Sequence, residues 1–555
     1  MSQAVQTTQS AGDVPKVELN PGARHVKRIV IADPLLSEGL SLLDAEPSLR
    51  VEDQTEATRD ELRLALRGAA AIIVRSRTRV DAELLEAGDA LEVIGRAGVG
   101  VDNIDLEAAT RRGIAVLNVP GANTVSTAEL AFGLILAAAR RIAEADRSLR
   151  DGGWERKRLR GAQLKGKVLG VVRAGRIGAE VIRRARAFGL EILVYDPYLT
   201  PERAHDLGLE LLDLEELLAR SDVVTLHVPR NETTEGMIGA AQLDRMKDDA
   251  ILINAARGGL VDEAALAEAL ASGSIAAAGL DVYVEEPLPP DSPLRDAPNL
   301  VMTPHLGAST EEAQREVSRQ IALAVRSALV SADFGPSLNA PYVGQGDLTR
   351  MAPVLSLGTH LGRLLAAITG GRCQRLDIGY AGPLDEILRP LAAGAMEGFL
   401  ESAVDQPLNL VNALALAGDR GIDVGRVRIG DVADYTNYVE LRAIVGPDQT
   451  VVGGALLGEG HHPRIVRIGG FHVDTAPDGV LLLVRNRDVP GVVGEVATKL
   501  GAEGINIGEY HLARNADAGR ALGVITLDGE VPNRVMAELR GLPAVEEVLQ
   551  VSFGT

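Results

Sequence analysis

The 555-residue sequence predicts an α/β protein with two doubly wound domains in tandem, followed by two smaller α+β domains. The chain is too long for one hydrophobic core, since a domain usually has about 100 to 200 residues. Short β-branched runs alternate with helical patterns between residues 28 and 303, as in parallel α/β sheets. Residues 480–553 instead give the element order βαββαβ, which is typical of ferredoxin-like folds.

The first doubly wound domain is predicted to combine residues 26–122 with residues 311–335. We expect strands at 29–31, 72–74, 93–94 and 115–117, and helices at 60–67 and 81–87. Residues 309–332 also have a helical pattern, which Ser309 and Glu312 would open as a capping box. Gly335 and Pro336 end this helix, so we expect a domain boundary there.

The second doubly wound domain is predicted at residues 123–310. Its strands are expected at 168–172, 192–195, 223–227, 251–254, 279–282 and 301–303. Residues 336–475 form an α+β domain without a recognisable chemical motif, and residues 478–555 form the last domain. The polar residues 1–25 lack the apolar core of a signal peptide, so they are interpreted as a flexible leader.

Composition narrows the possible partners. A formal charge of -20 argues against a nucleic-acid or anionic-membrane surface, so an anionic ligand would need a local arginine cluster. Cys373 is the only cysteine, which excludes an intrachain disulfide, offers no thiolate metal site and fits the cytoplasm. No uncharged apolar run has membrane-spanning length, and we predict neither a bound metal nor a membrane partner.

A dinucleotide site is predicted where the strand at 168–172 meets a glycine-rich turn and a helix. Gly175 and Gly178 would let the cofactor pyrophosphate approach the backbone, and the amides of Arg176 and Ile177 would bind it. Asp196, eighteen positions after Gly178, follows the next strand and is suited to an adenosine ribose. Because a carboxylate there repels a 2′-phosphate, NAD is favoured over NADP.

Arg173 departs from the glycine-rich pattern, since it occupies the position of the first glycine. If the backbone there is left-handed, a side chain costs on the order of 1–2 kcal/mol. Its bulk would crowd the cofactor, although its charge suits a pyrophosphate. Our hypothesis is that Arg173 weakens NAD binding without abolishing it.

A catalytic set is predicted from three segments that each follow an expected strand. They place Arg257, Glu286 and His305 at the carboxyl ends of strands, where open α/β sheets bind their ligands. His305 would accept the proton of an alcohol, and Glu286 would orient its imidazole. Arg257 would grip a substrate carboxylate. Each residue alone is more often structural or solvated, whereas the three together indicate hydroxy-acid oxidation.

These three segments, at 254–259, 281–287 and 303–310, resemble the D-isomer-specific 2-hydroxyacid dehydrogenase family. The segments 74–78, 95–103 and 151–156 resemble its phosphoglycerate dehydrogenase branch, and the resemblance covers nearly the whole chain. It implies two Rossmann-like domains, one for the substrate and one for NAD, and an intervening domain. The implied reaction oxidises 3-phosphoglycerate to 3-phosphohydroxypyruvate, the first step of L-serine synthesis.

The resemblance also implies site residues. Those expected to bind 3-phosphoglycerate are Arg75, Ser76, Gly98, Gly100, Asn103 and, from a neighbouring subunit, Arg140. Those expected to contact NAD are Val99, Gly175, Arg176, Ile177, Gly178, Asp196, Val228, Ala255, Ala256, Arg257, Asp281, His305, Leu306, Gly307 and Ala308. Arg75 and Arg140 remain open to interpretation as solvated surface charges. Arg230 is a second departure, because relatives usually have an apolar residue there.

The segments 485–494 and 504–507 resemble the ligand loop and second strand of an ACT regulatory domain. Asn486, Asp488 and Asn506 would then bind L-serine as a feedback effector, unless the domain is only structural or dimerising. The resemblance further implies a homotetramer. Two alternatives stay open, namely a dehydrogenase of another D-2-hydroxy acid and a non-catalytic NAD-sensing protein of the same fold.

Overall fold

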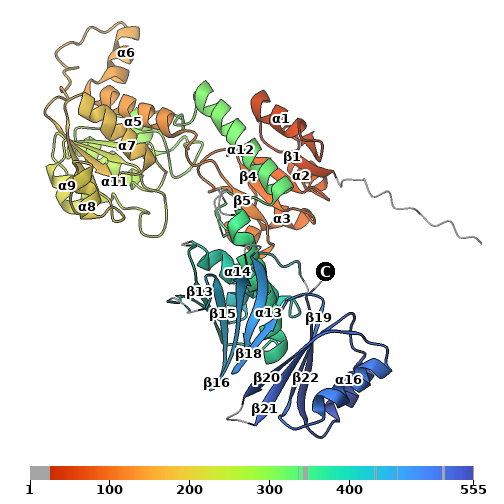
Figure 1. Ribbon diagram of the computed structural model, residues 1–555. Coiled ribbons are helices and arrows are strands. Elements are labelled where there is room, and N and C mark those ends of the chain that lie inside the picture. The colour runs from red at the N-terminus through yellow and green to blue at the C-terminus, as the bar shows by residue number, and fades with distance from the viewer. Residues whose placement is uncertain are drawn as a thin grey trace, which may run out of the picture.

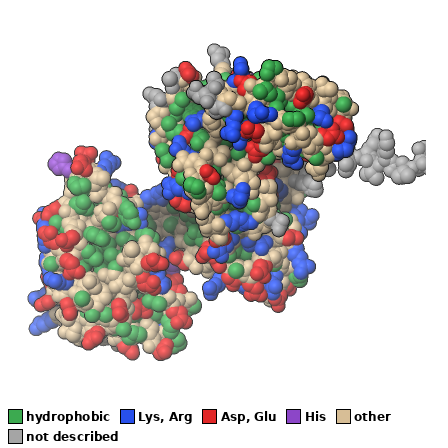
Figure 2. Space-filling view, turned by 90° about the horizontal axis from the view of Figure 1, so that it is seen from below, with side chains coloured by type: hydrophobic (Ala, Val, Ile, Leu, Met, Phe, Trp, Pro, Cys, Tyr) green, Lys and Arg blue, Asp and Glu red, His purple; other side chains and the backbone are tan. Residues whose placement is uncertain are grey.

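The computed structural model describes residues 26–335, 337–341, 348–384, 386–404, 406–430, 432, 434–458, 461–515 and 519–553. The predicted leader at 1–25 and Pro336 lie outside the described residues. Figure 1 shows two parallel-sheet units side by side, with two further units below them. On the face seen in Figure 2, acidic and basic side chains are interspersed rather than gathered by sign.

The first unit is a five-stranded parallel sheet with the strand order β2-β1-β3-β4-β5. Its elements are β1 (Lys27–Ile31), α1 (Ser37–Asp44), β2 (Leu49–Asp53), α2 (Arg59–Ala65), β3 (Ala71–Val74), α3 (Ala82–Ala87), β4 (Val93–Arg96), α4 (Leu106–Arg111) and β5 (Ala115–Leu117). Helix α12 (Glu311–Ser331) returns to this sheet and buries Val317 and Ile321 against Ile73. This strand order places a ligand crevice at the carboxyl ends of β1 and β3.

The start of α12 differs from the prediction. Thr310, not Ser309, is the N-cap, and its hydroxyl accepts a hydrogen bond from the Ala313 amide at 3.2 Å. Ser309 still belongs to the preceding turn, because its amide donates to the carbonyl of Leu306. The predicted capping box of Ser309 and Glu312 is therefore wrong.

The second unit is a seven-stranded parallel sheet with the order β12-β11-β10-β9-β6-β7-β8. Its elements are α5 (Thr124–Ala139), α6 (Ile142–Arg150), β6 (Val168–Val172), α7 (Arg176–Ala187), β7 (Glu191–Tyr195), α8 (Pro201–Asp206), β8 (Glu210–Leu211), α9 (Leu214–Arg220), β9 (Val223–Leu226), α10 (Ala240–Leu243), β10 (Ile251–Asn254), α11 (Glu263–Ser272), β11 (Ala277–Leu280), the 3₁₀ helix η1 (Pro293–Asp296) and β12 (Leu300–Met302). The order is that of a Rossmann sheet extended by one strand, and its ligand crevice lies between β6 and β9.

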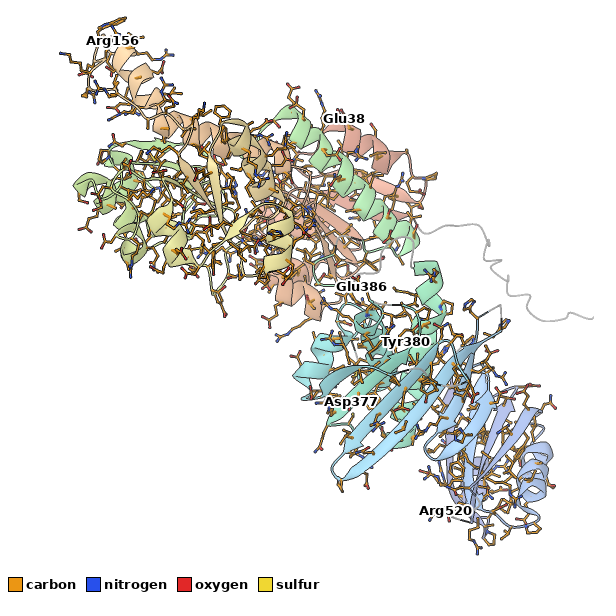
Figure 3. The ribbon with its side chains drawn as sticks, turned by 60° about the vertical axis from the view of Figure 1, so that its left-hand side comes forward. Glu38, Arg156, Asp377, Tyr380, Glu386 and Arg520 are labelled. Atoms are coloured by element: carbon orange, nitrogen blue, oxygen red, sulfur yellow. The ribbon has the colours of Figure 1, made fainter. Side chains whose placement is uncertain are left out.

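Helix α6 and the segment after it project from the second unit, and Figure 3 shows Arg156 at the tip of this projection. Ile142, Leu149 and Trp154 on it are 53%, 59% and 78% exposed. A cavity of about 750 Å³ lies at its base, between α5, α6 and the residues that lead into β12. Large apolar side chains left in water on a projection indicate a contact surface.

The third unit has a mixed six-stranded sheet with the order β14-β13-β15-β16-β17-β18. Its elements are α13 (Leu348–Thr369), β13 (Arg375–Ala381), α14 (Leu388–Leu400), α15 (Ala413–Asp419), β14 (Asp423–Arg428), β15 (Tyr438–Val445), β16 (Asp448–Leu457), β17 (His462–Ile468) and β18 (Phe471–Thr475). By length and composition α13 alone among the described helices could cross a membrane, but Leu357, Leu361 and Leu365 on it are buried in the core. It therefore has the burial of a core helix.

The fourth unit confirms the predicted order βαββαβ. Its elements are β19 (Val480–Arg487), α16 (Val492–Ala502), β20 (Ile507–Asn515), β21 (Arg520–Leu527), α17 (Asn533–Arg540) and β22 (Val545–Ser552). All strand pairs are antiparallel, in the order β20-β21-β19-β22. Leu481 and Leu483 on the face away from α16 share a core with α13, so the third and fourth units are packed together.

Candidate active site

Three neighbouring strands of the second sheet deliver the predicted catalytic residues. Arg257 follows β10, Glu286 follows β11 and His305 follows β12, and these strands are adjacent in the parallel sheet. Their carboxyl ends lie at one edge, facing the first unit. The prediction that these side chains share an edge is confirmed by the strand order.

His305 and Glu286 form a hydrogen-bonded pair. The distance from His305 Nδ1 to Glu286 Oε2 is 2.6 Å, and the imidazole remains half-exposed toward the cleft. The hydrogen bond that His305 donates to Glu286 raises the pKa of His305 against the opposing effect of burial. Burial raises the pKa of Glu286, but the hydrogen bonds from His305 and the Tyr283 amide outweigh it, and the pKa is lowered. The pair therefore favours a protonated imidazole beside a carboxylate.

Asp281 holds the turn that carries His305. Its carboxylate accepts hydrogen bonds from the hydroxyl of Thr303 at 2.6 Å and from the amides of Leu306 and Gly307 at 2.7 and 2.9 Å. The side chain is fully buried, which raises its pKa despite these donors. Both oxygens of Asp281, which is also a predicted cofactor contact, bind the protein and fix the turn that follows His305.

Arg257 points toward the first unit. Its Nε lies 3.3 Å from Asp102 Oδ2, and one Nη donates to the carbonyl of Ala256 at 2.7 Å. The side chain of Asn254 pins this turn, since it accepts from the Ala256 amide and donates to the Arg257 carbonyl. The guanidinium is thus held across the cleft with part of its donor set free for a ligand.

The loops after β3 and β4 contribute the predicted substrate residues. Asn103 donates both of its amide hydrogens, to the carbonyls of Arg75 at 2.7 Å and Thr78 at 2.6 Å. It therefore ties the two loops together and leaves only its oxygen for a ligand. A Cβ on Gly100 would lie 2.4 Å from an Nη atom of Arg257, so this loop passes directly over the guanidinium. Ser76, on the loop after β3, is exposed.

Arg140 lies away from this cleft within one chain. It caps the carboxyl end of α5, whose first turn contacts the active-site turn through Ser126 and the carbonyl of Gly307. A helix of this length spans about 24 Å at 1.5 Å per residue. Arg140 therefore lies about one helix length from the active-site turn of its own chain.

The glycine-rich turn has the geometry of a dinucleotide cradle. Gly175 is the N-cap of α7, and a Cβ on Gly178 would lie 2.3 Å from the carbonyl oxygen of Arg173. The carboxylate of Asp196 accepts from the amides of Ala174 and Tyr198 and lies beside the turn. Free amides at a helix start and a carboxylate at the next strand end fit a dinucleotide's pyrophosphate and ribose.

Arg173 adopts the left-handed backbone that a glycine at this position would favour, with φ of +76°. Its guanidinium lies over the ring of Tyr198, 5.7 Å from the centroid, and its Nε lies 3.9 Å from the Cβ position of Gly175. The side chain thus crosses the path between the helix start and the ribose carboxylate. The left-handed backbone that the sequence analysis considered for Arg173 is therefore confirmed.

The other predicted cofactor residues line the same edge. Val228 and Ala255 are buried, whereas Val99, Ala256 and Ala308 are partly exposed and Leu306 is exposed; Ile177 is partly exposed at the start of α7. Arg176 is exposed and donates to the carbonyl of Pro120 at 3.3 Å, which links the two units. Arg230 pairs with Glu235, and its guanidinium packs on Gly259.

The predicted effector residues lie at opposite ends of the sheet of the fourth unit: Asn486 and Asp488 are at the end of Arg520, and Asn506 is at the end of Leu527. Asn486 is buried, and its Oδ1 accepts no hydrogen bond from the described residues, whereas its Nδ2 donates to the carbonyl of Arg487. Asp488 forms an ion pair with Arg514 at 2.7 Å. Asn506 donates to Asp528 at 2.7 Å, so it faces a different partner from the other two.

Asp33 and Thr303 hold loops of the site, and the sequence analysis did not predict either of them as a functional residue. Asp33, two residues after the end of β1, accepts hydrogen bonds from the Arg75 amide and from the amide and hydroxyl of Thr78. Thr303 holds Asp281. The signal in the sequence was an acidic residue after an apolar strand, but the partners of Asp33 follow a different strand and become visible only in the fold.

Comparisons with known proteins agree with this geometry. The family model of the D-isomer specific 2-hydroxyacid dehydrogenase NAD binding domain matches residues 132–307, and that of the D-3-phosphoglycerate dehydrogenase intervening domain matches residues 350–469. NAD is therefore the cofactor of the second unit.

Curated relatives match nearly the whole chain. D-3-phosphoglycerate dehydrogenases from Archaeoglobus fulgidus and Methanocaldococcus jannaschii are 39% and 40% identical to it, each over 95% of this chain and 100% of the relative. The crystal structure of D-lactate dehydrogenase from Aquifex aeolicus complexed with NAD and lactic acid is 28% identical, with a TM-score of 0.50 over 56% of this chain and 99% of that chain. The chain belongs to the D-3-phosphoglycerate dehydrogenase family, within the D-isomer specific 2-hydroxyacid dehydrogenases.

Proposed function

We propose that the protein oxidises 3-phospho-D-glycerate to 3-phosphohydroxypyruvate with NAD, as the first step of L-serine synthesis. The observation that carries the proposal is the His305–Glu286 pair at 2.6 Å, held at the carboxyl edge of a Rossmann sheet beside Arg257. The names of the relatives support the choice of substrate.

His305 is the proposed base. Its Nε2 accepts the proton of the substrate hydroxyl while Nδ1 stays hydrogen-bonded to Glu286, whose negative charge stabilises the imidazolium that forms. Bound NAD supplies the hydride acceptor. Asp281 and Thr303 position the imidazole by fixing its turn, so little reorganisation is needed when the proton moves.

Arg257 is proposed to bind the substrate carboxylate and to polarise the carbonyl that forms. The loop of Gly98 and Gly100 offers close backbone approach to that carboxylate, and Arg75 and Ser76 contribute to the phosphate end. Arg140 of a neighbouring subunit completes the phosphate site. In this proposal the second unit carries out the oxidation, and the first unit contributes most of the substrate-binding loops.

The proposed cofactor contacts follow the strand ends. The amides of Arg176 and Ile177 and the glycines Gly175 and Gly178 hold the pyrophosphate, and Asp196 takes the adenosine ribose. The remaining proposed contacts are Val99, Val228, Ala255, Ala256, Arg257, Asp281, His305, Leu306, Gly307 and Ala308.

We propose four domains and an outlying leader. Residues 26–122 and 311–335 bind substrate, residues 123–310 bind NAD, residues 336–475 are the intervening domain, residues 478–555 are an ACT domain, and residues 1–25 are the leader. The Oδ1 of Asn486, which accepts no hydrogen bond from the described residues, is suited to the ammonium group of L-serine, and Asp488 lies at the same end of the sheet. Asn506 lies at the opposite end and would contribute from a paired copy of the domain. If so, L-serine lowers activity in wild-type protein and not in the Asn486→Ala variant, and identical inhibition of both would contradict this site.

A homotetramer in the cytoplasm is the proposed working form. The exposed apolar side chains on the α6 projection support a subunit contact. Because Arg140 is at the base of this projection, the same contact would bring it toward a neighbouring active site.

A panel of D-2-hydroxy acids tests the proposal. The rate of NADH formation is measured with 3-phosphoglycerate, D-glycerate and D-lactate at equal concentrations. We expect 3-phosphoglycerate to give the highest kcat/KM. A higher value for an acid without phosphate favours the alternative dehydrogenase, and NAD binding without turnover of any acid favours a non-catalytic NAD sensor.

A further inference from the structure

The turn that carries His305 has a backbone conformation that a residue with a side chain rarely adopts. His305 has a φ of +53°, in the left-handed region. Such a conformation persists only where the surrounding structure fixes it. Asp281 fixes part of the turn, because it accepts hydrogen bonds from the amides of Leu306 and Gly307. The carbonyl of Gly307 is held by a different element, the first turn of α5.

Two hydroxyl groups of α5 donate to the Gly307 carbonyl. Ser126 Oγ lies 2.8 Å and Thr127 Oγ1 lies 3.0 Å from the carbonyl oxygen, and both hydrogen bonds are buried. A buried carbonyl has lost its hydrating water, so these two donors replace it. Ser126 Oγ also lies 3.1 Å from the carbonyl of Asn123, whereas Gly307 is the only acceptor of Thr127 among the described residues. Thr127 is therefore the more dedicated donor of the two.

Gly307 is enclosed between the start of α5 and Asp281. A Cβ on Gly307 would lie 3.3 Å from Oγ1 and from Cγ2 of Thr127, and 3.4 Å from Oδ2 of Asp281. The helix that provides this wall is itself anchored, since Ala131 and Ile135 on it are buried in the core of the second unit. Side chains on an anchored helix hold a site more accurately than side chains on a loop. The first turn of α5 is thus a fixed support for the turn of His305.

We propose that Ser126 and Thr127 are positioning residues for His305, because their hydroxyls fix the Gly307 carbonyl and so hold the imidazole against Glu286. This inference rests on the proposed function, since it names the groups that keep the proposed base in place. Glu286 lies on a separate loop after β11, so a turn without these hydroxyls can move relative to it. Asp281 and Gln314 still hold other atoms of the turn, so the turn is loosened and the fold is kept.

The Ser126→Ala/Thr127→Val double variant removes both hydroxyls. Its kcat with 3-phosphoglycerate should fall by about 10- to 100-fold, because a small displacement of a reacting group has an effect of this size. The KM should change by less than about threefold, since Arg257 lies on a different loop. Thr127→Val alone should lower kcat more than Ser126→Ala alone. Thr127→Ser keeps the hydroxyl and should retain kcat within about threefold.

The pH profile separates positioning from a general loss of stability. If His305 moves away from Glu286, its raised pKa falls back toward the ordinary 6.5, and the rising limb of kcat/KM moves to lower pH. The other charges that act on His305, those of Asp281 and Arg257, stay in place in the double variant. Hydrogen exchange of residues 303–310, followed by mass spectrometry, should be faster in the same variant.

Thr124→Val is the matched control, because Thr124 lies on the same turn of α5 and its hydroxyl has no hydrogen-bond partner among the described residues. It should change neither kcat, nor the pH profile, nor the exchange. Wild-type kcat in the double variant, a lower kcat with an unshifted limb, or an equal loss in Thr124→Val would each overturn the assignment.

A wild-type protein that forms no NADH from any D-2-hydroxy acid would contradict the proposed function alone. Hydrogen exchange at residues 303–310 then decides the inference without turnover. Faster exchange in the double variant than in Thr124→Val supports the positioning role of Ser126 and Thr127, and equal exchange in the two variants overturns it.

Discussion

At the scale of single residues, the hydrogen bond between His305 and Glu286 decides the pH at which the imidazole can accept a proton. The oxidation needs a neutral imidazole, and Glu286 raises the pKa of His305 above its ordinary 6.5. The activity should therefore rise as the pH passes upward through this raised pKa.

The Glu286→Gln variant tests this dependence. Loss of the negative charge lowers the pKa of His305, so the rising limb of kcat/KM against pH moves to lower pH, and kcat itself falls by about 100-fold. The profile is measured between pH 5 and about 10. An unshifted limb would contradict the role of Glu286.

Arg173 presents a second test at this scale. Its left-handed backbone carries a strain on the order of 1–2 kcal/mol, and its side chain crosses the cofactor path. The Arg173→Gly variant should bind NAD more tightly, by about fivefold or more, in a calorimetric titration. Unchanged or weaker binding would refute the hypothesis and would favour an attractive role for the guanidinium.

Side-chain partners are the part of the site that the sequence could not predict. Arg257, Glu286 and His305 were predictable because parallel strands bring their carboxyl ends to one edge. Asp281 and Asn103 were predicted as ligand contacts, but the sequence did not indicate that both also hold neighbouring loops: Asp281 accepts from the amides of Leu306 and Gly307, and Asn103 donates to the carbonyls of Arg75 and Thr78. These hydrogen-bond partners depend on the distances between loops that are far apart in the sequence.

At the scale of elements, the prediction located the parallel strands of both sheets but missed two edge strands. β2 alternates apolar and charged residues over a short span, and β8 has only two residues, so neither gives a run of β-branched side chains. The strand expected at 279–282 ends at Leu280, because Asp281 is turned inward to bind the His305 turn. Strand ends are thus set by the site rather than by the apolar pattern.

The corrected cap of α12 gives a test for this scale. The Thr310→Ala variant loses the hydroxyl that accepts from the Ala313 amide, which should cost about 1 kcal/mol. Amides in the first turn of α12 should then exchange their hydrogens about fivefold faster. Ser309→Ala is the control and should change exchange little; the reverse pattern would restore Ser309 as the cap.

At the scale of the whole molecule, the α6 projection is the surface least explained by a single chain. Its apolar side chains are exposed, although the second unit beneath it has its own buried core. An assembly would bury them and supply Arg140 to a second cleft. Catalysis would then depend on the assembly as well as on the fold.

Leu149→Asp tests this dependence, because it places a charge in the proposed contact. Sedimentation velocity should show a smaller species than wild type, with a lower kcat/KM for 3-phosphoglycerate. Leu64→Asp is the matched control, since Leu64 is also exposed, at 62%, but lies on α2. If both variants keep the wild-type assembly, the projection is not the contact.

The most direct test of the central claim is the formation of NADH from 3-phosphoglycerate and NAD by wild-type protein and by the His305→Ala variant. We predict turnover by the wild type and a loss of about 100- to 10,000-fold in the variant, with NAD affinity retained. Equal rates in the two proteins, or no NADH from the wild type, would contradict it.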